Sequence, residues 1–213
     1  MNRLITFEGV DGCGKSTQLS CAAEYLRRQG QAVVTSFEPG DSPLGKKIRQ
    51  LLLSGEFIPV PEAELLLFLA DRAQHVQEVI RPALEADAWV LCDRYSDSTL
   101  AYQLAARKLS DNANDLKQML SFAECGVSPA LTLWFDVPVA VAFERMKKRA
   151  AAGEKATRLD EEAISFHERV AEAFFDQFKA DATGRIQRID AGGDIEMVQR
   201  QVSKLLDQRC SHL

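Results

Sequence analysis

The stretch FEGVDGCGKST at residues 7–17 limits the possible folds of this chain more than any other segment. It matches the pattern G-x-x-x-x-G-K-[ST], with an apolar run before it and helical periodicity after it. In such a loop the glycines let backbone N–H groups turn towards a phosphate, the lysine reaches the β- and γ-phosphates, and the serine hydroxyl can ligate Mg²⁺. We therefore expect a bound nucleoside triphosphate, the alternative being a glycine-rich turn without a ligand. The residues expected around the triphosphate are Gly9, Val10, Asp11, Gly12, Cys13, Gly14, Lys15, Ser16 and Thr17.

Short strand-like runs alternate with longer stretches of helical periodicity along the chain. Most of these runs are largely apolar, which is typical of strands buried on both faces of a parallel sheet. The pattern predicts an α/β fold of three layers, in which a five-stranded parallel sheet is flanked by helices on both faces. The predicted strands are 4–7, 32–37, 89–92, 131–135 and the weaker 185–189, and the predicted helices are 15–29, 43–54, 61–86, 96–107, 112–125, 138–151, 160–180 and 194–208.

Composition fits a single domain spanning 1–213 and restricts the functional classes. No apolar stretch is long enough to cross a bilayer, the first residues lack a signal-peptide pattern, and the five cysteines form no CxxC pair. We expect a cytoplasmic protein without a membrane segment. The net charge of −5 argues against a nucleic-acid binder, since such proteins present a broad cationic face.

The phosphate loop identifies a phosphoryl donor but leaves the reaction open, because small GTPases, motor ATPases and nucleotide kinases share it. A GTPase would carry an Asn-Lys-x-Asp motif, and the sequence contains no Asn-Lys pair. The acceptor side must therefore be sought elsewhere in the chain.

The segment DRYSDSTLAYQ follows a predicted buried strand and places Asp93 and Arg94 at the strand's carboxyl end, where ligands bind in open α/β sheets. Asp93 can hold Mg²⁺ or its waters, and Arg94 offers a planar set of donors for a phosphate. Ser98 and Tyr102 share one helical face, with Gln103 adjacent, so these polar groups could bind a nucleoside. The alternative is a structural ion pair beside an ordinary helix surface.

The segment LLLFLADRAQHV places Phe68 and Arg72 four residues apart on one helical face. A flat base could stack on this ring beside the cation. The alternative is that Phe68 is an ordinary core residue.

These segments together resemble the thymidylate kinases, which transfer the γ-phosphoryl group of ATP to dTMP. Across nearly the whole chain, their order and spacing are similar to those of this family: FEGVDGCGKST, FEPGDSPLGKKIR, LLFLADRAQHV, DRYSDSTLAYQ and FDVP. The resemblance implies a three-layer P-loop NTPase fold and Mg²⁺-dependent, direct in-line transfer that makes dTDP. It also implies a homodimer, formed through apolar helices such as 61–80.

The resemblance also implies a role for each matching residue. Asp11 is expected near the sugar 3′-hydroxyl or the metal, and Arg94 at the acceptor phosphate. For Mg²⁺, the loop motif already indicates Ser16 and the position at the strand's end indicates Asp93. The residues expected at the thymidine are Phe68, stacked on the base, Arg72, bonded to it, Ser98 and Gln103, lining its pocket, and Tyr102, under the deoxyribose.

A mobile lid is expected at about residues 149–158. Residues 144–158 hold six basic and two acidic residues in a chain that is acidic overall. Some members of the family carry a charge-stabilising arginine in the phosphate loop; this loop has none, which implies that the lid supplies it on closure. Arg149 and Arg158 are the candidates, with Arg145 expected near the adenine, and a solvated basic helix end is the alternative. Lys15, Arg94 and Asp11 complete the expected catalytic set.

The sequence departs from the family pattern on the acceptor side. Phe37 stands where an arginine is usual and Asp41 where a glycine is usual, so we expect one cation fewer near the acceptor phosphate. A kinase for another nucleoside monophosphate or for a deoxynucleoside is therefore the nearest alternative. A nucleotide-binding regulator without transferase activity is the alternative from another class. His75, His167 and His212 have no metal-ligand spacing and receive no role.

Overall fold

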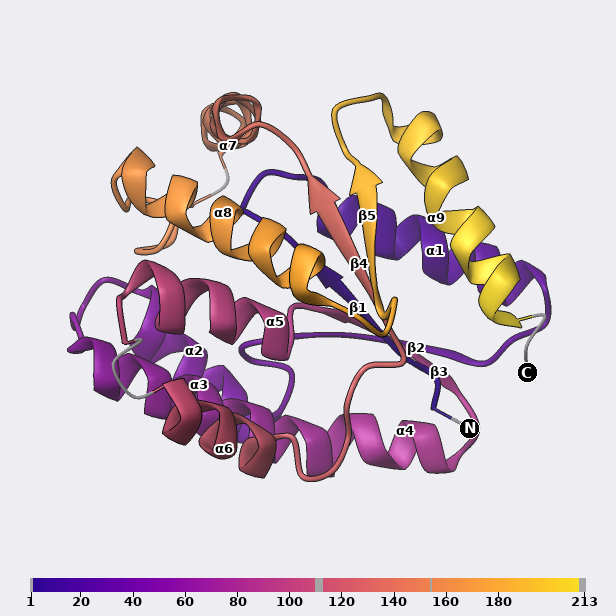
Figure 1. Cartoon of the computed structure of the whole chain (residues 1–213), viewed down its shortest axis with the longest axis horizontal. Coiled ribbons are helices and arrows are strands. Elements are labelled where there is room, and N and C mark those ends of the chain that lie inside the picture. Colours follow the sequence, from indigo (N-terminus) through magenta and orange to yellow (C-terminus); the bar gives the residue numbers. More distant parts are fainter. Residues whose placement is uncertain (1, 110–112, 154, 211–213) are drawn as a thin grey trace.

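The computed structural model describes residues 2–109, 113–153 and 155–210. A parallel sheet of five strands forms its centre, in the order β2-β3-β1-β4-β5 (Figure 1). Each strand falls on a predicted run, so the predicted sheet is confirmed. The strands are β1 Leu4–Glu8, β2 Val33–Phe37, β3 Trp89–Asp93, β4 Leu131–Asp136 and β5 Ile186–Asp190.

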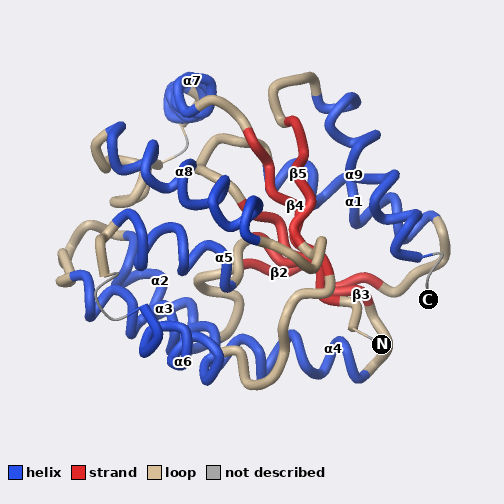
Figure 2. Tube along the Cα trace, in the orientation of Figure 1, coloured by secondary structure: helices blue, strands red, loops and turns tan. Residues whose placement is uncertain are grey.

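Helices cover both faces of this sheet, as the sequence predicts. One layer holds α1 and α9, which pack on each other, and the opposite layer holds α3, α4, α5 and α8 (Figures 1 and 2). The helices and helical turns are α1 Lys15–Arg28, α2 Pro43–Leu53, α3 Pro61–His75, η1 Val76–Ile80, α4 Arg81–Glu85, α5 Ser96–Thr99, η2 Leu100–Ala106, α6 Ala113–Ala123, α7 Val139–Ala151, α8 Ile164–Ala180 and α9 Ile195–Cys210.

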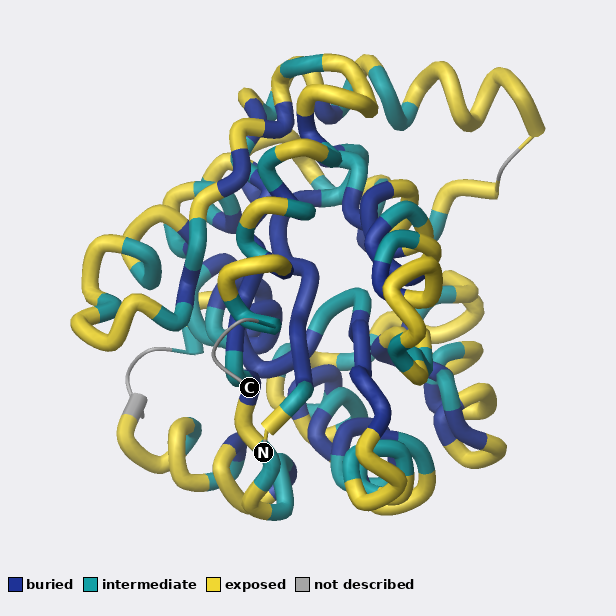
Figure 3. Tube along the Cα trace, turned by 90° about the vertical axis from the view of Figure 1, so that its right-hand side faces the viewer, coloured by how far each residue is buried: buried dark blue, intermediate teal, exposed yellow. Residues whose placement is uncertain are grey.

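The three inner strands, β1, β3 and β4, are buried from both sides because their side chains alternate between two apolar layers. Phe7 and Leu91 belong to the same core cluster as Leu26 of α1, while Leu4 and Val90 belong to a second cluster with η1. Figure 3 shows the buried residues, in dark blue, gathered at the centre of the molecule. The apolar side chains of β1, β3 and β4 therefore hold the sheet, while the edge strands β2 and β5 are more exposed. In β5, Gln187, Arg188 and Asp190 are polar, which accounts for its weaker apolar pattern in the sequence.

Two predicted helices contain a wider, π-type stretch. The predicted helix 61–86 is continuous as α3, η1 and α4, and the predicted helix 96–107 appears as α5 and η2. Pro82 lies just after η1 and has no N–H to donate to the preceding turn, which accounts for the altered hydrogen bonding there.

The predicted helix 160–180 begins later than expected, at Ile164. Thr157 and Asp160 close a turn instead: the Thr157 N–H donates to Asp160 Oδ2 at 2.7 Å, and the Asp160 N–H donates to Thr157 O at 3.0 Å. The helix predicted from 112 is described from Ala113 onwards. Glu154 in the predicted lid and His212 in the tail lie outside the described residues. In the described ranges, none of the helices has the length and apolar character needed to cross a membrane.

Candidate active site

One cavity of about 830 Å³ opens at the carboxyl ends of β1, β2 and β3, next to the phosphate loop. This is the edge of a parallel sheet at which ligands usually bind. The structure brings nearly all predicted site residues to its wall: Asp11, Gly12, Gly14, Lys15, Ser16, Thr17, Phe68, Arg72, Asp93, Arg94, Ser98, Tyr102, Gln103, Arg145 and Arg149. The predicted residues of the phosphate loop and of the acceptor side therefore share one space.

The phosphate loop runs from the end of β1 into α1 and depends on glycine at two close approaches. A Cβ on Gly9 would lie 2.7 Å from the carbonyl oxygen of Phe135, and one on Gly12 would lie 2.3 Å from that of Ala142; both glycines also have positive φ. Lys15, the first residue of α1, is buried, and its Nζ donates to Gly9 O at 3.0 Å and to Val10 O at 2.9 Å. The loop therefore holds this ammonium group against its own backbone.

Two oxygen groups meet beside the loop. Ser16 Oγ donates to Asp93 Oδ2 at 2.6 Å, although the two residues lie far apart in the chain. Mg²⁺ prefers oxygen ligands and is usually held by one or two protein groups plus waters and phosphate oxygens. The hydroxyl and carboxylate fit this ion, and the described residues contain no cluster of three or more His, Cys, Asp or Glu that would suggest another metal.

Arg94 is the centre of a hydrogen-bonded group on the predicted acceptor side. This group, called the Arg94 hub below, also includes Asp11, Ser98 and Tyr102. Its φ of 72° lies in the left-handed region, which is costly for a residue with a side chain and is found mainly where a site requires it. Nη1 donates to Gly9 O at 3.1 Å and Ser98 Oγ at 3.0 Å, and Nη2 donates to Asp11 Oδ1 at 2.6 Å and Tyr102 OH at 3.1 Å. The guanidinium thus links the phosphate loop to the helix that follows β3.

Asp11 and Tyr102 complete this hub. The Tyr102 hydroxyl donates to Asp11 Oδ2 at 2.9 Å. Burial alone would raise the pKa of Asp11, but the charges of Arg94 and Lys15 outweigh it and hold that pKa well below its ordinary value. Asp11 is therefore an anion paired with Arg94.

Glu8 lies beneath the hub and is fully buried at the end of β1. Its carboxyl oxygens accept from the Tyr95 N–H at 2.7 Å and from Ser98 Oγ at 2.6 Å. Burial and the neighbouring charge of Asp97 raise the pKa of Glu8 to about 8. Glu8 orients Ser98, which in turn accepts from Arg94.

The predicted base-binding residues lie at the α3 side of the cavity. Phe68 is half-buried at the cavity wall. Arg72 is buried, and its Nε and Nη2 face Glu38 Oε2 at 2.9 Å and 2.7 Å while Nη1 donates to Thr99 Oγ1 at 2.8 Å. Gln103 is also buried, and its Nε2 donates to Glu64. The Arg72 guanidinium is thus held by Glu38, and the Gln103 amide by Glu64.

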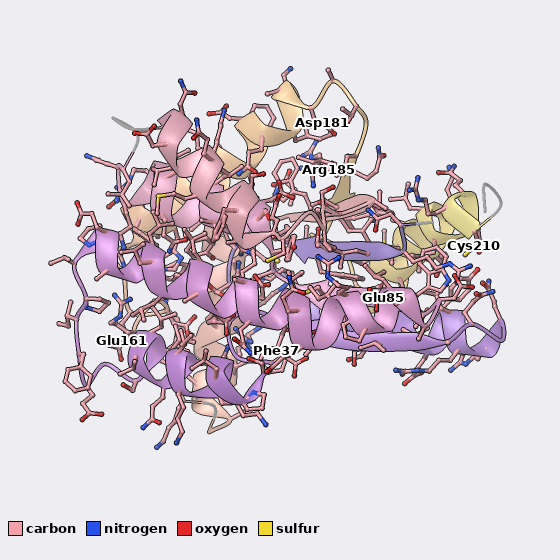
Figure 4. All side chains as sticks on the ribbon, turned by 90° about the horizontal axis from the view of Figure 1, so that it is seen from below. Phe37, Glu85, Glu161, Asp181, Arg185 and Cys210 are labelled. Carbon is pink, nitrogen blue, oxygen red and sulfur yellow. The ribbon has the colours of Figure 1, made fainter. Side chains whose placement is uncertain are left out.

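A cation that the sequence analysis did not assign lies beside Phe37, which is labelled in Figure 4. The guanidinium carbon of Arg49 lies 5.6 Å from the centre of the Phe37 ring, and Arg49 Nη1 donates to Pro39 O at 2.7 Å. Burial, with Arg94 nearby, lowers the pKa of Arg49 from its ordinary value, although a guanidinium stays charged. The predicted acceptor side therefore has a cation from α2 beside Phe37, the residue that stands where an arginine is usual.

The two predicted lid arginines and Arg145, which was predicted near the adenine, lie in different surroundings. Arg145 Nη1 donates to Cys13 O at 3.4 Å and Nη2 to Ala191 O at 3.0 Å, so it lies against the phosphate loop. Arg149, in the last turn of α7, lies at the cavity wall. Arg158 is instead bonded to Glu64 and donates from Nε to Leu52 O at 3.0 Å.

Several residues that support the site were not predicted from the sequence. Glu38 holds Arg72, His75 Nδ1 faces Glu38 Oε1 at 2.9 Å, and Ser36 Oγ is bonded to His75 Nε2. Asp41, which stands in place of a glycine, accepts from Ser36 Oγ at 2.6 Å. The position of Glu38 and Arg49 within the segment FEPGDSPLGKKIR was a usable signal, whereas the helical spacing around His75 gave none.

The comparisons with known proteins agree with this geometry. The family model described as "Thymidylate kinase" matches residues 7–202. The chain is 42% identical over 211 residues to the thymidylate kinase of Syntrophus aciditrophicus, covering 97% of this chain and 95% of that protein. It is 49% identical over 170 residues to that of Thermomicrobium roseum, covering 80% and 78%. The crystal structure of thymidylate kinase from Ehrlichia chaffeensis matches with a TM-score of 0.75 and 31% identity, covering 97% of this chain and 98% of that one. The chain therefore belongs to the thymidylate kinase family.

Proposed function

We propose that this protein phosphorylates dTMP to dTDP with ATP and Mg²⁺. The observation that carries the proposal is the shared cavity, in which the phosphate loop, the Arg94 hub and the base-binding residues Phe68, Arg72 and Gln103 line one space. A donor triphosphate and an acceptor nucleotide can then lie with their phosphates facing each other. Lys15 lies at the donor end and Arg94 between the two ends.

The cations do most of the chemical work in this proposal. The attacking oxygen of a nucleoside monophosphate is already ionised at neutral pH, so no strong base is needed, and catalysis consists of alignment and charge neutralisation. Lys15 would bind the transferred group after leaving its loop carbonyls, and Arg94 and Arg49 would hold the acceptor phosphate. Mg²⁺, held by Ser16 and Asp93, would neutralise charge on the donor phosphates.

A lid at about 149–158 would complete the site. Closure would bring Arg149 towards the transferred phosphoryl group and exclude water that could otherwise hydrolyse ATP. Arg145, already beside Cys13 O, would contact the adenine nucleotide. Arg158 remains the second catalytic candidate, although its present partners tie it to Glu64.

We also propose a cytoplasmic homodimer. The five cysteines carry free thiols, which suits a reducing compartment. Leu66 of α3 and Phe122 of α6 are exposed by 54% and 84%, and apolar side chains of this size on neighbouring helices are suited to contact with a second copy. Sedimentation of the wild type and of Leu66→Asp tests this proposal: a wild-type monomer would contradict it.

The test of function is ADP release in the presence of Mg²⁺ and ATP, with dTMP, dUMP, dCMP, UMP, AMP and thymidine offered separately. We expect strong release with dTMP, weaker release with dUMP and little with the others, and chelation of Mg²⁺ should abolish the signal. Release with another acceptor but not with dTMP would support the other-kinase alternative. ATP binding without release for any acceptor would support the regulator.

A further inference from the structure

Glu64 is a buried carboxylate at which the base pocket and the predicted lid meet. It lies on α3 and its side chain is 1% exposed. Oε1 accepts from Gln103 Nε2 at 3.1 Å and from Arg107 Nε at 3.1 Å, and Oε2 accepts from Arg107 Nη2 at 3.1 Å and from Arg158. A single side chain thus contacts the amide at the cavity wall and Arg158 at the end of the predicted lid.

The two arginines keep this carboxylate ionised. Burial alone would raise the pKa of Glu64, but the hydrogen bonds from Arg107, Arg158 and Gln103 together outweigh it and hold that pKa below its ordinary value. Glu162 is the second acidic partner of both arginines: its Oε1 lies 2.6 Å from Arg107 Nη2 and 3.8 Å from Arg158 Nη1. An ionised carboxylate can accept hydrogen bonds but cannot donate them.

The charge on Glu64 therefore determines which way the Gln103 amide faces. The NH₂ group must point to Glu64, because the amide oxygen would be repelled by the carboxylate. The amide oxygen is then turned away from Glu64, and because Gln103 also lines the cavity, this oxygen is the group available to a ligand there. An oxygen at this position can accept a hydrogen bond from an N–H group of the bound base, and it repels a nitrogen lone pair.

This orientation distinguishes the two kinds of pyrimidine. Thymine and uracil carry a donor at N3–H beside an acceptor at O4, whereas cytosine carries a lone pair at N3 beside a donor at N4. Arg72, a donor in the same cavity, fits O4 of thymine, and the oxygen of Gln103 fits N3–H. With cytosine, Arg72 would face the N4 donor and the Gln103 oxygen would face the N3 lone pair. A polar site strongly rejects a base that leaves its groups unpaired in this way.

We propose that Glu64 is a positioning residue that sets the preference for thymine over cytosine by fixing the orientation of the Gln103 amide. This rests on the proposed function, because it takes dTMP as the acceptor. It extends that function by assigning a specificity role to a residue that does not itself line the cavity. It also gives Arg158 a role through Glu64, as one of the charges that keep the carboxylate ionised.

The test compares Glu64→Gln with the matched control Glu162→Gln. Each variant removes one carboxylate from the same two arginines, but only the first removes the charge that faces Gln103. Equilibrium binding of dTMP and dCMP, measured by titration calorimetry without ATP, gives the preference as a ratio of dissociation constants. In Glu64→Gln the amide can turn either way, so we expect this ratio to fall at least tenfold, while the dissociation constant for ATP changes by less than twofold. Glu162→Gln should leave the ratio within twofold.

A purely structural role for Glu64 would weaken dTMP, dCMP and ATP together and leave the ratio unchanged, which would overturn the proposal. If Glu64→Gln does not fold by circular dichroism, Gln103→Met provides the second test, since it keeps Glu64 with both arginines. Retention of the wild-type ratio in Gln103→Met would also overturn the proposal. A wild type that binds neither nucleotide would overturn the proposed function together with this inference, whereas a wild type that prefers dTMP while Glu64→Gln keeps that preference would overturn the inference alone.

Discussion

Arg94→Lys offers the sharpest test of the acceptor side, because it keeps the positive charge and removes the planar set of donors. In the structure, the two terminal nitrogens of Arg94 make four hydrogen bonds, to Gly9 O, Ser98 Oγ, Asp11 Oδ1 and Tyr102 OH. A lysine ammonium is one nitrogen with three donors, so it cannot serve the phosphate loop, the helix and an acceptor phosphate in the same geometry.

The magnitude follows from the bonds lost to charged groups. Such a hydrogen bond contributes about 1.5–3 kcal/mol. We count the loss of one to two of them when the acceptor phosphate binds, or about 3 kcal/mol, which is roughly 100-fold in kcat/KM for dTMP. The KM for ATP should change less than kcat/KM for dTMP does, since Lys15, Ser16 and Asp93 are untouched.

The assay is steady-state ADP release with dTMP varied at saturating ATP, and then with ATP varied. Arg169→Lys is the matched control: Arg169 lies on α8 and donates to Ala106 O and Ser165 O, so it should leave both constants within about twofold. If Arg94→Lys kept kcat/KM for dTMP within about fivefold of wild type, a shift under about 1 kcal/mol, the assigned role of the planar guanidinium would be refuted.

Three further predictions follow from the lid, the buried acid and the core. Arg149→Ala or Arg158→Ala should lower kcat more than about tenfold, and turnover within about twofold in both variants would contradict a catalytic lid arginine. Burial raises the pKa of Glu8 from 4.5 to about 8, so the folded state keeps a proton that the unfolded state loses, and this contribution to stability is present below pH 4.5 and is lost as the pH rises through 8. The melting temperature should therefore fall from pH 5 to pH 8 less in Glu8→Gln than in wild type, and equal slopes would argue against the raised pKa. Leu133→Ala, at a fully buried position of β4, should lower the free energy of unfolding by about 2–5 kcal/mol in urea titrations, and a loss under about 1 kcal/mol would show that the site tolerates a cavity.

The fold could be predicted from the sequence because its inner strands are buried on both faces and the strands are separated by amphipathic helices. The phosphate loop could be predicted equally well from the sequence, because its chemistry depends on residues that are adjacent in the chain. Glu64 could not be assigned in this way, and Arg49, although it lies in a segment that resembles the family, could not be placed beside Phe37. Their roles depend on which helix returns to the cavity and at what rotation, and local periodicity does not contain that information. Arg158 shows the same limit: its sequence position suggested a free lid cation, and the fold pairs it with an acid from α3.

The central position of β1 also bears on how the chain acquires activity as it is made. Phe7 is paired with Asp93 on one side and with Leu133 on the other, and β2 pairs with β3. The first two strands in the chain, β1 and β2, therefore do not pair with each other. The sheet cannot begin to form until β3, which lies between them, has been synthesised. The phosphate loop, among the earliest segments translated, gains both of its supporting neighbours only after β4 is complete. A nascent chain that ends before residue 131 should consequently fail to hold a triphosphate, however intact its loop sequence is.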